Sequence, residues 1–194
     1  MVYRYLGLAD LTSGIIALVV SFFAYKCYTT INDRRFLLLE LSFLVMGLGM
    51  GMRGFSLIIA SKRTLHILMT CILIEAIARI VSYIILAVAY TMQLMSSRTM
   101  LIGIYLLRIF ILDPIVDTIA IFLLSYVVFN IGMTLFKGRS KLTLIVFIAF
   151  FLLTLSHMFS IIGHYIPSLF YVTLSYLTQL SSFILLLIML LRVG

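Results

Sequence analysis

The side chains of this sequence best suited to bind a metal or a cofactor are its three histidines, His66, His157 and His164. His157 and His164 are seven residues apart, which is about 10.5 Å along a helix, too far for both to bind one ion. His66 paired with His164, or with His157, has the chemistry to hold one haem b between two helices. The sequence therefore allows a haem b with His66 and His164 as metal ligands. The alternative interpretation places these histidines at the membrane interface or in a helix seam.

Two arginines extend the same hypothesis, because Arg53 and Arg108 are expected in the same half of the molecule as the histidines. A guanidinium binds carboxylates and phosphates through charge-assisted hydrogen bonds. We therefore expect Arg53 and Arg108 to contact the propionates of a haem or the headgroup of an anionic lipid.

Glu75 and Arg79 are the charged residues placed deepest in an apolar segment. They are four residues apart in the favourable acid-first order, so they share one helix face and predict an intramembrane ion pair. A proton or ion relay is the functional alternative. The sequence favours the structural pair, because Asp10, Asp113 and Asp117 are expected at helix ends and offer no second carboxylate at that depth.

A glycine-rich stretch predicts close helix packing. Gly47 and Gly51 form a GxxxG spacing and Gly54 continues the same face. Small residues at this spacing let another helix backbone approach. The alternative is that the glycines open a slot for a cofactor or a lipid.

The composition requires a membrane around these residues. Of 194 residues, 64% are hydrophobic and 10% are charged, whereas soluble domains have about 25% charged residues. The net charge of +8 comes from basic residues scattered between apolar runs, which is typical of membrane-protein loops and does not indicate nucleic-acid binding. No catalytic motif is found, so we expect a non-catalytic chain whose residues 1–194 form a single transmembrane helical bundle domain in a lipid bilayer.

The helices that position these residues follow from length, since about 20 apolar residues span the hydrocarbon core. One further segment, Met95–Leu112, ends at Asp113-Pro114, and Pro114 is expected in the first turn of the next helix. The fold class is thus an all-α polytopic bundle of seven, alternatively six, transmembrane helices. The six clear segments are Leu8–Ile31, Phe36–Ala60, Leu65–Met92, Ile115–Phe136, Leu142–His164 and Pro167–Leu191.

The distribution of Lys and Arg favours seven helices. With seven, eight basic residues lie inside and three outside, whereas six helices give seven inside and five outside. Cytoplasmic loops are enriched in Lys and Arg. We therefore expect a multi-pass protein of the cell membrane with its N-terminus outside and its C-terminus in the cytoplasm.

An internal repeat is a second argument for seven helices. An offset of 107 residues aligns Asp10 with Asp117 and Arg34 with Lys141. This alignment predicts two parallel three-helix halves joined by a linker helix, an arrangement known in some transporters. The alternative is that membrane helices resemble one another by composition alone.

The function that the sequence favours is a non-catalytic subunit of a larger membrane complex, for example a prokaryotic respiratory or redox complex. Such a subunit would anchor other membrane protein subunits and hold lipid or quinone. Short loops, the glycine face and the lack of a recognisable polar pocket support this interpretation. The alternatives are an electron-transfer subunit that binds haem b, and a small transporter or membrane sensor.

Overall fold

The structure is a computed structural model that describes residues 2–59, 65–91, 113–138, 140–166 and 168–193. These residues form only helices and the short turns between them. The helices contain 25 to 30 residues, so the shortest rises about 37 Å and exceeds the ~30 Å hydrocarbon core. Their bounds are α1 Val2–Ile31, α2 Arg34–Ile59, α3 Leu65–Thr91, α5 Asp113–Gly138, α6 Lys141–Tyr165 and α7 Leu169–Val193.

This architecture confirms the prediction of an all-α polytopic membrane bundle, because all six described helices are long and apolar enough to cross a bilayer. Pro114 occupies the second position of α5, where a missing backbone N–H costs no helical hydrogen bond. The predicted seventh helix at Met95–Leu112 lies outside the described residues. The count of seven therefore finds no support among the helices that the structure describes.

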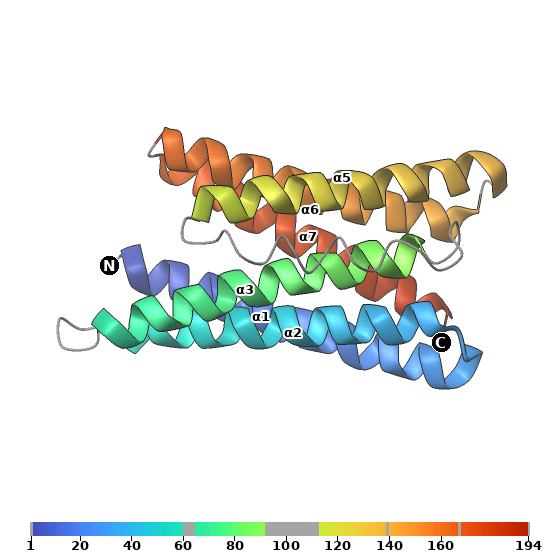
Figure 1. Cartoon of the computed structure of the whole chain (residues 1–194), viewed down its shortest axis with the longest axis horizontal. Coiled ribbons are helices and arrows are strands. Elements are labelled where there is room, and N and C mark those ends of the chain that lie inside the picture. Colours follow the sequence, from blue (N-terminus) through green and yellow to red (C-terminus); the bar gives the residue numbers. More distant parts are fainter. Residues whose placement is uncertain (1, 60–64, 92–112, 139, 167, 194) are drawn as a thin grey trace.

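The six helices form two groups of three that lie side by side along one axis (Figure 1). In the first group α2 packs against α1 and α3, and in the second α6 packs against α5 and α7. Two equivalent contacts join the groups, because α1 packs against α7 and α5 packs against α3. Each group thus contributes its first and third helix to the interface between them.

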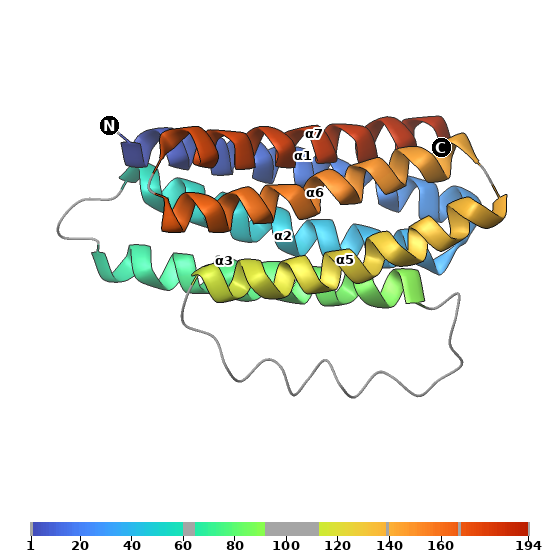
Figure 2. The ribbon, with the colours of Figure 1, turned by 90° about the horizontal axis from the view of Figure 1, so that it is seen from above.

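The helices alternate in direction within each group (Figure 2). α1, α3, α5 and α7 begin at one end of the bundle, which we call the N-terminal end, and α2 and α6 run back towards it. α3 therefore ends opposite the point where α5 begins, and the N-terminus and C-terminus lie at opposite ends. The far end, which we call the basic end, carries Lys26, Arg34, Arg35, Lys137, Lys141 and Arg192.

The buried positions of the first two helices recur in the second group at the offset of 107 residues. On α1 and α5, the pairs of buried residues include Asp10 with Asp117 and Val20 with Val127. α2 and α6 show the same register in a longer series. The buried pairs on these two helices include Leu39 with Val146, Phe43 with Phe150, Met46 with Leu153 and Met50 with His157.

The glycine face joins α2 to α1 within this chain. A Cβ built on Gly47 would lie 3.0 Å from the backbone oxygen of Gly14, and one built on Gly54 would lie 2.7 Å from that of Gly7. A Cβ on Gly51 would meet nothing within 4 Å. Gly51 takes part in the contact through its backbone, because its nitrogen would lie 3.0 Å from a Cβ built on Gly14, whereas the position of its own Cβ is open.

Candidate functional site

Six charged or titratable side chains from five helices converge in the half of the bundle near the N-terminal end. They are joined by ion pairs into one chain, which we call the charged network. All its members have little exposure to the surroundings. The network consists of Asp10 of α1, Arg53 of α2, Glu75 and Arg79 of α3, Asp117 of α5 and His157 of α6.

Asp10 and Asp117 lie deeper than the sequence predicts. α1 begins at Val2, six residues before the expected start, so Asp10 is more than two turns inside the helix and 4% exposed. Asp117 lies one turn into α5 and is also 4% exposed. The prediction that Asp10 opens its helix is therefore wrong, because α1 extends further toward the N-terminal end, whereas Asp117 lies near the start of its helix as predicted but is buried.

Glu75 is the centre of the network. Arg79 donates from Nε to Glu75 Oε1 at 2.7 Å and makes a second, short contact from Nη2. Arg53 Nη1 donates to Glu75 Oε2 at 3.3 Å. Glu75 is 2% exposed. Both of its oxygens accept from guanidiniums, so its charge is compensated by Arg53 of α2 as well as by Arg79 of its own helix.

Asp117 links the network to α6. Its Oδ1 accepts from Arg79 Nη1 at 3.1 Å and from His157 Nδ1 at 2.8 Å. Its Oδ2 accepts from the Ser160 hydroxyl at 2.6 Å. Three hydrogen bonds, two of them from nitrogen donors, thus satisfy both oxygens of this buried carboxylate.

His157 is enclosed by partners on both ring nitrogens. Its Nδ1 faces Asp117, and its Nε2 lies 2.5 Å from the hydroxyl oxygen of Tyr83. The rings of Tyr83 and His157 meet edge to face with centroids 5.2 Å apart. Tyr83 is fully buried and His157 is 4% exposed, so the imidazole is fixed in position and orientation.

Asp10 stands at the other end of the network. The Tyr176 hydroxyl of α7 donates to its Oδ1 at 2.8 Å, and Arg53 Nε lies 3.3 Å from its Oδ2. That approach is too poorly aligned for a hydrogen bond, so Asp10 Oδ2 and Arg53 Nε are both buried without a hydrogen-bond partner. Buried polar atoms in this condition are places where water or a ligand is expected.

A cavity of about 230 Å³ lies beside the network. Helices of both groups line it, and polar and apolar groups contribute about equally to its wall. Besides Asp10, Arg53, Arg79, Asp117 and His157, it is lined by Ser156, Ser160, Ser175, Tyr176 and Gln179. Because polar groups in hydrocarbon are costly, a wall of this kind is suited to hold water or a small polar solute.

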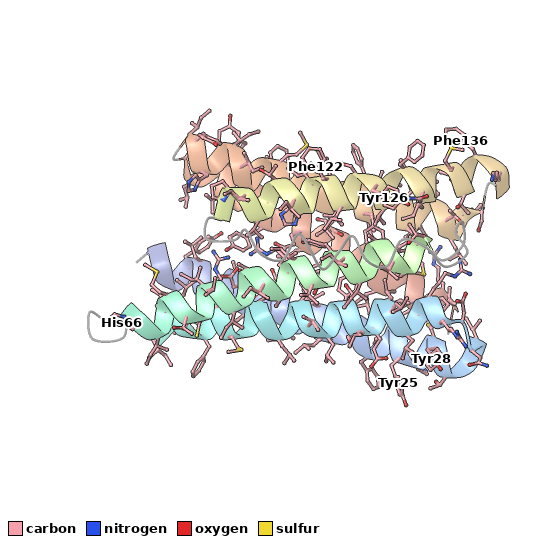
Figure 3. The ribbon with its side chains drawn as sticks, viewed as in Figure 1. Tyr25, Tyr28, His66, Phe122, Tyr126 and Phe136 are labelled. Carbon is pink, nitrogen blue, oxygen red and sulfur yellow. The ribbon has the colours of Figure 1, made fainter. Side chains whose placement is uncertain are left out.

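Of the residues predicted to bind a cofactor, Arg53, His157 and His164 line this cavity and His66 does not. His66 is exposed at the start of α3 (Figure 3), and His164 is exposed near the end of α6. Arg108 lies outside the described residues. Of the predicted cofactor residues, only Arg53 and His157 join the charged network, together with the predicted ion pair of Glu75 and Arg79.

The side chains do not suit a haem. Nδ1 and Nε2 of His157 are both engaged, so neither is free to bind iron. Among the described residues, no group of three His, Cys, Asp or Glu side chains converges to hold a metal ion. The guanidinium of Arg53 pairs with Glu75 and Asp10, so it is not available to bind haem propionates in this arrangement.

Sequence reasoning did not assign Asp10, Asp117, Tyr83, Ser160 or Tyr176 to a site. The recurrence of Asp10 and Asp117 at an offset of 107 residues was a usable signal for two of them. Tyr83 and Tyr176 carry no such signal, because a tyrosine in an apolar helix also packs as an aromatic residue.

Comparisons of this chain with protein-family models, with curated protein sequences and with solved structures find no match.

Proposed function

We propose that this protein is a small membrane transporter for a polar solute, built from two three-helix halves. The observation that carries the proposal is the polar cavity at the interface of the halves, to which both halves contribute charged side chains. Transporter folds with internal repeats place their substrate site in this position. A cavity of about 230 Å³ is of a size for one small molecule.

A second cavity supports the same proposal. It measures about 350 Å³ and is lined at the basic end by residues such as Asp33, Arg35 and Tyr90, with Ser140 and Met189 from the other half. Fully buried side chains separate the two cavities on four helices. They are Phe43 on α2, Tyr83 and Leu86 on α3, Phe150 and Leu153 on α6, and Phe183 and Leu186 on α7.

Two cavities on opposite sides of a packed barrier are what a transporter needs to expose one site to each side of the membrane in turn. The equivalent contacts of α1 with α7 and of α5 with α3 provide an interface over which the halves can rock. The matching burial at an offset of 107 residues supports an origin of the halves as parallel repeats.

The orientation of the bundle in the membrane is part of the same proposal. α1 begins at the N-terminal end and α7 ends at the basic end, which places the two termini on opposite sides of the membrane. The basic end belongs in the cytoplasm because cytoplasmic segments are enriched in Lys and Arg.

The interpretation as a non-catalytic complex subunit loses two of its three arguments. The glycine face is occupied by α1 of the same chain, so it offers no surface to a partner. A convergent polar pocket is present, whereas that interpretation depended on its absence. The haem hypothesis loses His157, both of whose nitrogens are engaged.

The test is the accessibility of the cavity from each side of the membrane. Ser175 lines the cavity, and Ser175→Cys is made in a background in which Cys27 and Cys71 are replaced. A membrane-impermeant maleimide is applied to vesicles of each orientation. Phe122→Cys is the control, because Phe122 is 72% exposed on the outer face of α5 and should stay unlabelled in lipid.

A transporter requires that Ser175→Cys be labelled from both sides, faster from the side of the N-terminal end. Labelling from one side only would indicate a sensor or a binding protein, and labelling from neither side would indicate a closed structural core. Either of these results contradicts the proposed function.

A further inference from the structure

We propose that His157 is a reversible proton-binding site and that the proton is the coupling ion of this protein. The second part rests on the proposed transport function, whereas the first stands on the geometry of the charged network. The ligand is thus a proton, held between Asp117 and Tyr83 on the wall of the cavity.

The charge balance of the network points to this site. Its three carboxylates face two guanidiniums, so the network carries one net negative charge while His157 is neutral. A proton on His157 brings the net charge to zero. A buried cluster within a membrane is expected to favour the neutral sum, because an uncompensated charge in hydrocarbon is costly.

The order of the charges points to the same residue. Along the network negative and positive groups alternate from Asp10 through Arg53, Glu75 and Arg79 to Asp117. Glu75 lies between two cations, and Asp117 lies between Arg79 and His157. An imidazolium at His157 would therefore complete the alternation with no change of position.

The hydrogen bonds around His157 accommodate both protonation states. Asp117 Oδ1 already accepts from Arg79, so it is an acceptor and His157 Nδ1 carries a hydrogen. In neutral His157, Nε2 then accepts from the Tyr83 hydroxyl. When a hydronium ion gives its proton to Nε2, an O–H bond breaks, an N–H bond forms and a water molecule is left. The Tyr83 hydroxyl then rotates so that its oxygen accepts instead, since a hydroxyl is both donor and acceptor.

Among the described residues, charged and titratable groups face His157 from the helices around it, and His164 of α6 itself lines the same cavity. α3 supplies Arg79, Glu75 and Tyr83, and α5 supplies Asp117. α1, α2 and α7 contribute Asp10, Arg53 and Tyr176 across the cavity.

Asp10 is the competing position for the proton, because its Oδ2 has no hydrogen-bond partner. A proton there would remove one of the two carboxylates that compensate Arg53. The guanidinium would remain buried with Glu75 alone, which Arg79 already shares. The proton on His157 instead adds a positive charge next to an existing negative one, so His157 is the better site.

The experiment is a pH titration followed by nitrogen NMR of the full chain labelled at histidine. The double variant His66→Gln, His164→Gln removes the two exposed histidines, which lie outside the network, and leaves His157 as the source of all imidazole signals. A neutral ring gives two different nitrogen shifts and an imidazolium gives two similar ones. We expect a reversible change from the first to the second between about pH 8 and pH 5.

Two further variants locate the proton. Asp117→Asn removes the negative partner and should leave His157 neutral throughout that range, and Tyr83→Phe should leave the change in place with altered shifts at Nε2. A ring that stays neutral while the wild-type chain is folded overturns the proposal. In a second sample labelled with 13C at the aspartate carboxyl groups, a shift of the Asp10 carboxyl signal while His157 stays neutral also overturns it.

This outcome is independent of the accessibility test for transport. If Ser175→Cys is labelled from one side only but His157 titrates, the proton site stands and transport fails. If labelling occurs from both sides but His157 stays neutral, transport stands and the proton is not its coupling ion.

Discussion

Glu75 is the residue whose replacement should disturb the fold most within the charged network. Its carboxylate compensates Arg53 and Arg79 while only 2% exposed. Glu75→Gln leaves both guanidiniums buried and undercompensated, and removing one member of a buried ion pair costs about 3–5 kcal/mol. We expect a loss of this size in the free energy of unfolding, measured by denaturant titration in detergent micelles.

The matched control for that change is Glu40→Gln. Glu40 is half-buried near the start of α2 and forms no ion pair among the described residues. Its replacement should alter the free energy of unfolding by no more than about 0.5 kcal/mol. Equal effects of the two substitutions would contradict the central position of Glu75.

A second prediction concerns Asp33 in the turn between α1 and α2, outside the membrane-spanning helices. Hydrogen bonds from the Arg35 side chain lower the pKa of Asp33 below its ordinary value of 3.8. The stabilisation is therefore present above pH 3.8 and is lost as the pH falls through the lower pKa of the folded state. Because the Arg35 side chain is 44% exposed, the pair contributes less than about 1 kcal/mol.

Asp33→Asn isolates this charge, since an amide oxygen can still accept from the backbone N–H of Arg35 as Asp33 does. The variant should melt slightly below the wild type at pH 7, and the difference should vanish in acid. Added salt should reduce the difference at pH 7 as well, because it screens an exposed pair. A difference that persists in acid would mean that the effect comes from the hydrogen bond with the backbone N–H of Arg35 and not from the charge.

At the scale of elements, the contact between α1 and α2 depends on glycines spaced seven residues apart. A Cβ on Gly54 would lie 2.7 Å from the backbone oxygen of Gly7 and 2.8 Å from the backbone nitrogen of Leu11. Backbone atoms cannot rotate away, so Gly54→Ala must separate the helices. We expect a loss of about 1–3 kcal/mol in the free energy of unfolding, as overpacking typically costs.

Gly51→Ala is the control on the same helix, three residues away. Its Cβ would meet nothing within 4 Å, and alanine is favoured over glycine in a helix by up to about 1 kcal/mol. Thermal unfolding should show Gly51→Ala at or above the wild type and Gly54→Ala below it. The reverse order would mean that α1 and α2 do not pack in this register.

At the scale of the whole molecule, the direction of the helices predicts where the termini lie. α1 begins and α7 ends at opposite ends of the bundle. A fluorescent protein that matures only in the cytoplasm should therefore glow when fused after the C-terminus, next to the basic end. A short tag before the N-terminus should be reached by antibody on intact cells.

Both termini on one side would contradict the parallel arrangement of the halves. A pair of arginine substitutions at the N-terminal end gives a control, because added positive charge there should weaken the orientation.

Sequence alone was sufficient to predict the class of this protein and the course of its six described helices. An apolar run long enough to span hydrocarbon must form a helix, since every backbone polar group needs a partner within the segment. This is a local requirement, so the predicted boundaries are correct within a few residues except at the start of α1. The ion pair of Glu75 and Arg79 could be predicted for the same reason, because both residues lie four positions apart on one helix.

Only the tertiary structure decided which polar side chains meet. Asp10 and Tyr176 are bonded across 166 positions of the chain, and Asp117 joins His157 across 40. Such contacts depend on how deeply each helix is set in the bundle and how it is rotated about its axis. Hydrophobic periodicity is weak in helices that are apolar all round, so the sequence carries little information on that rotation. The charged network and its cavity therefore emerged only when the two halves were packed together.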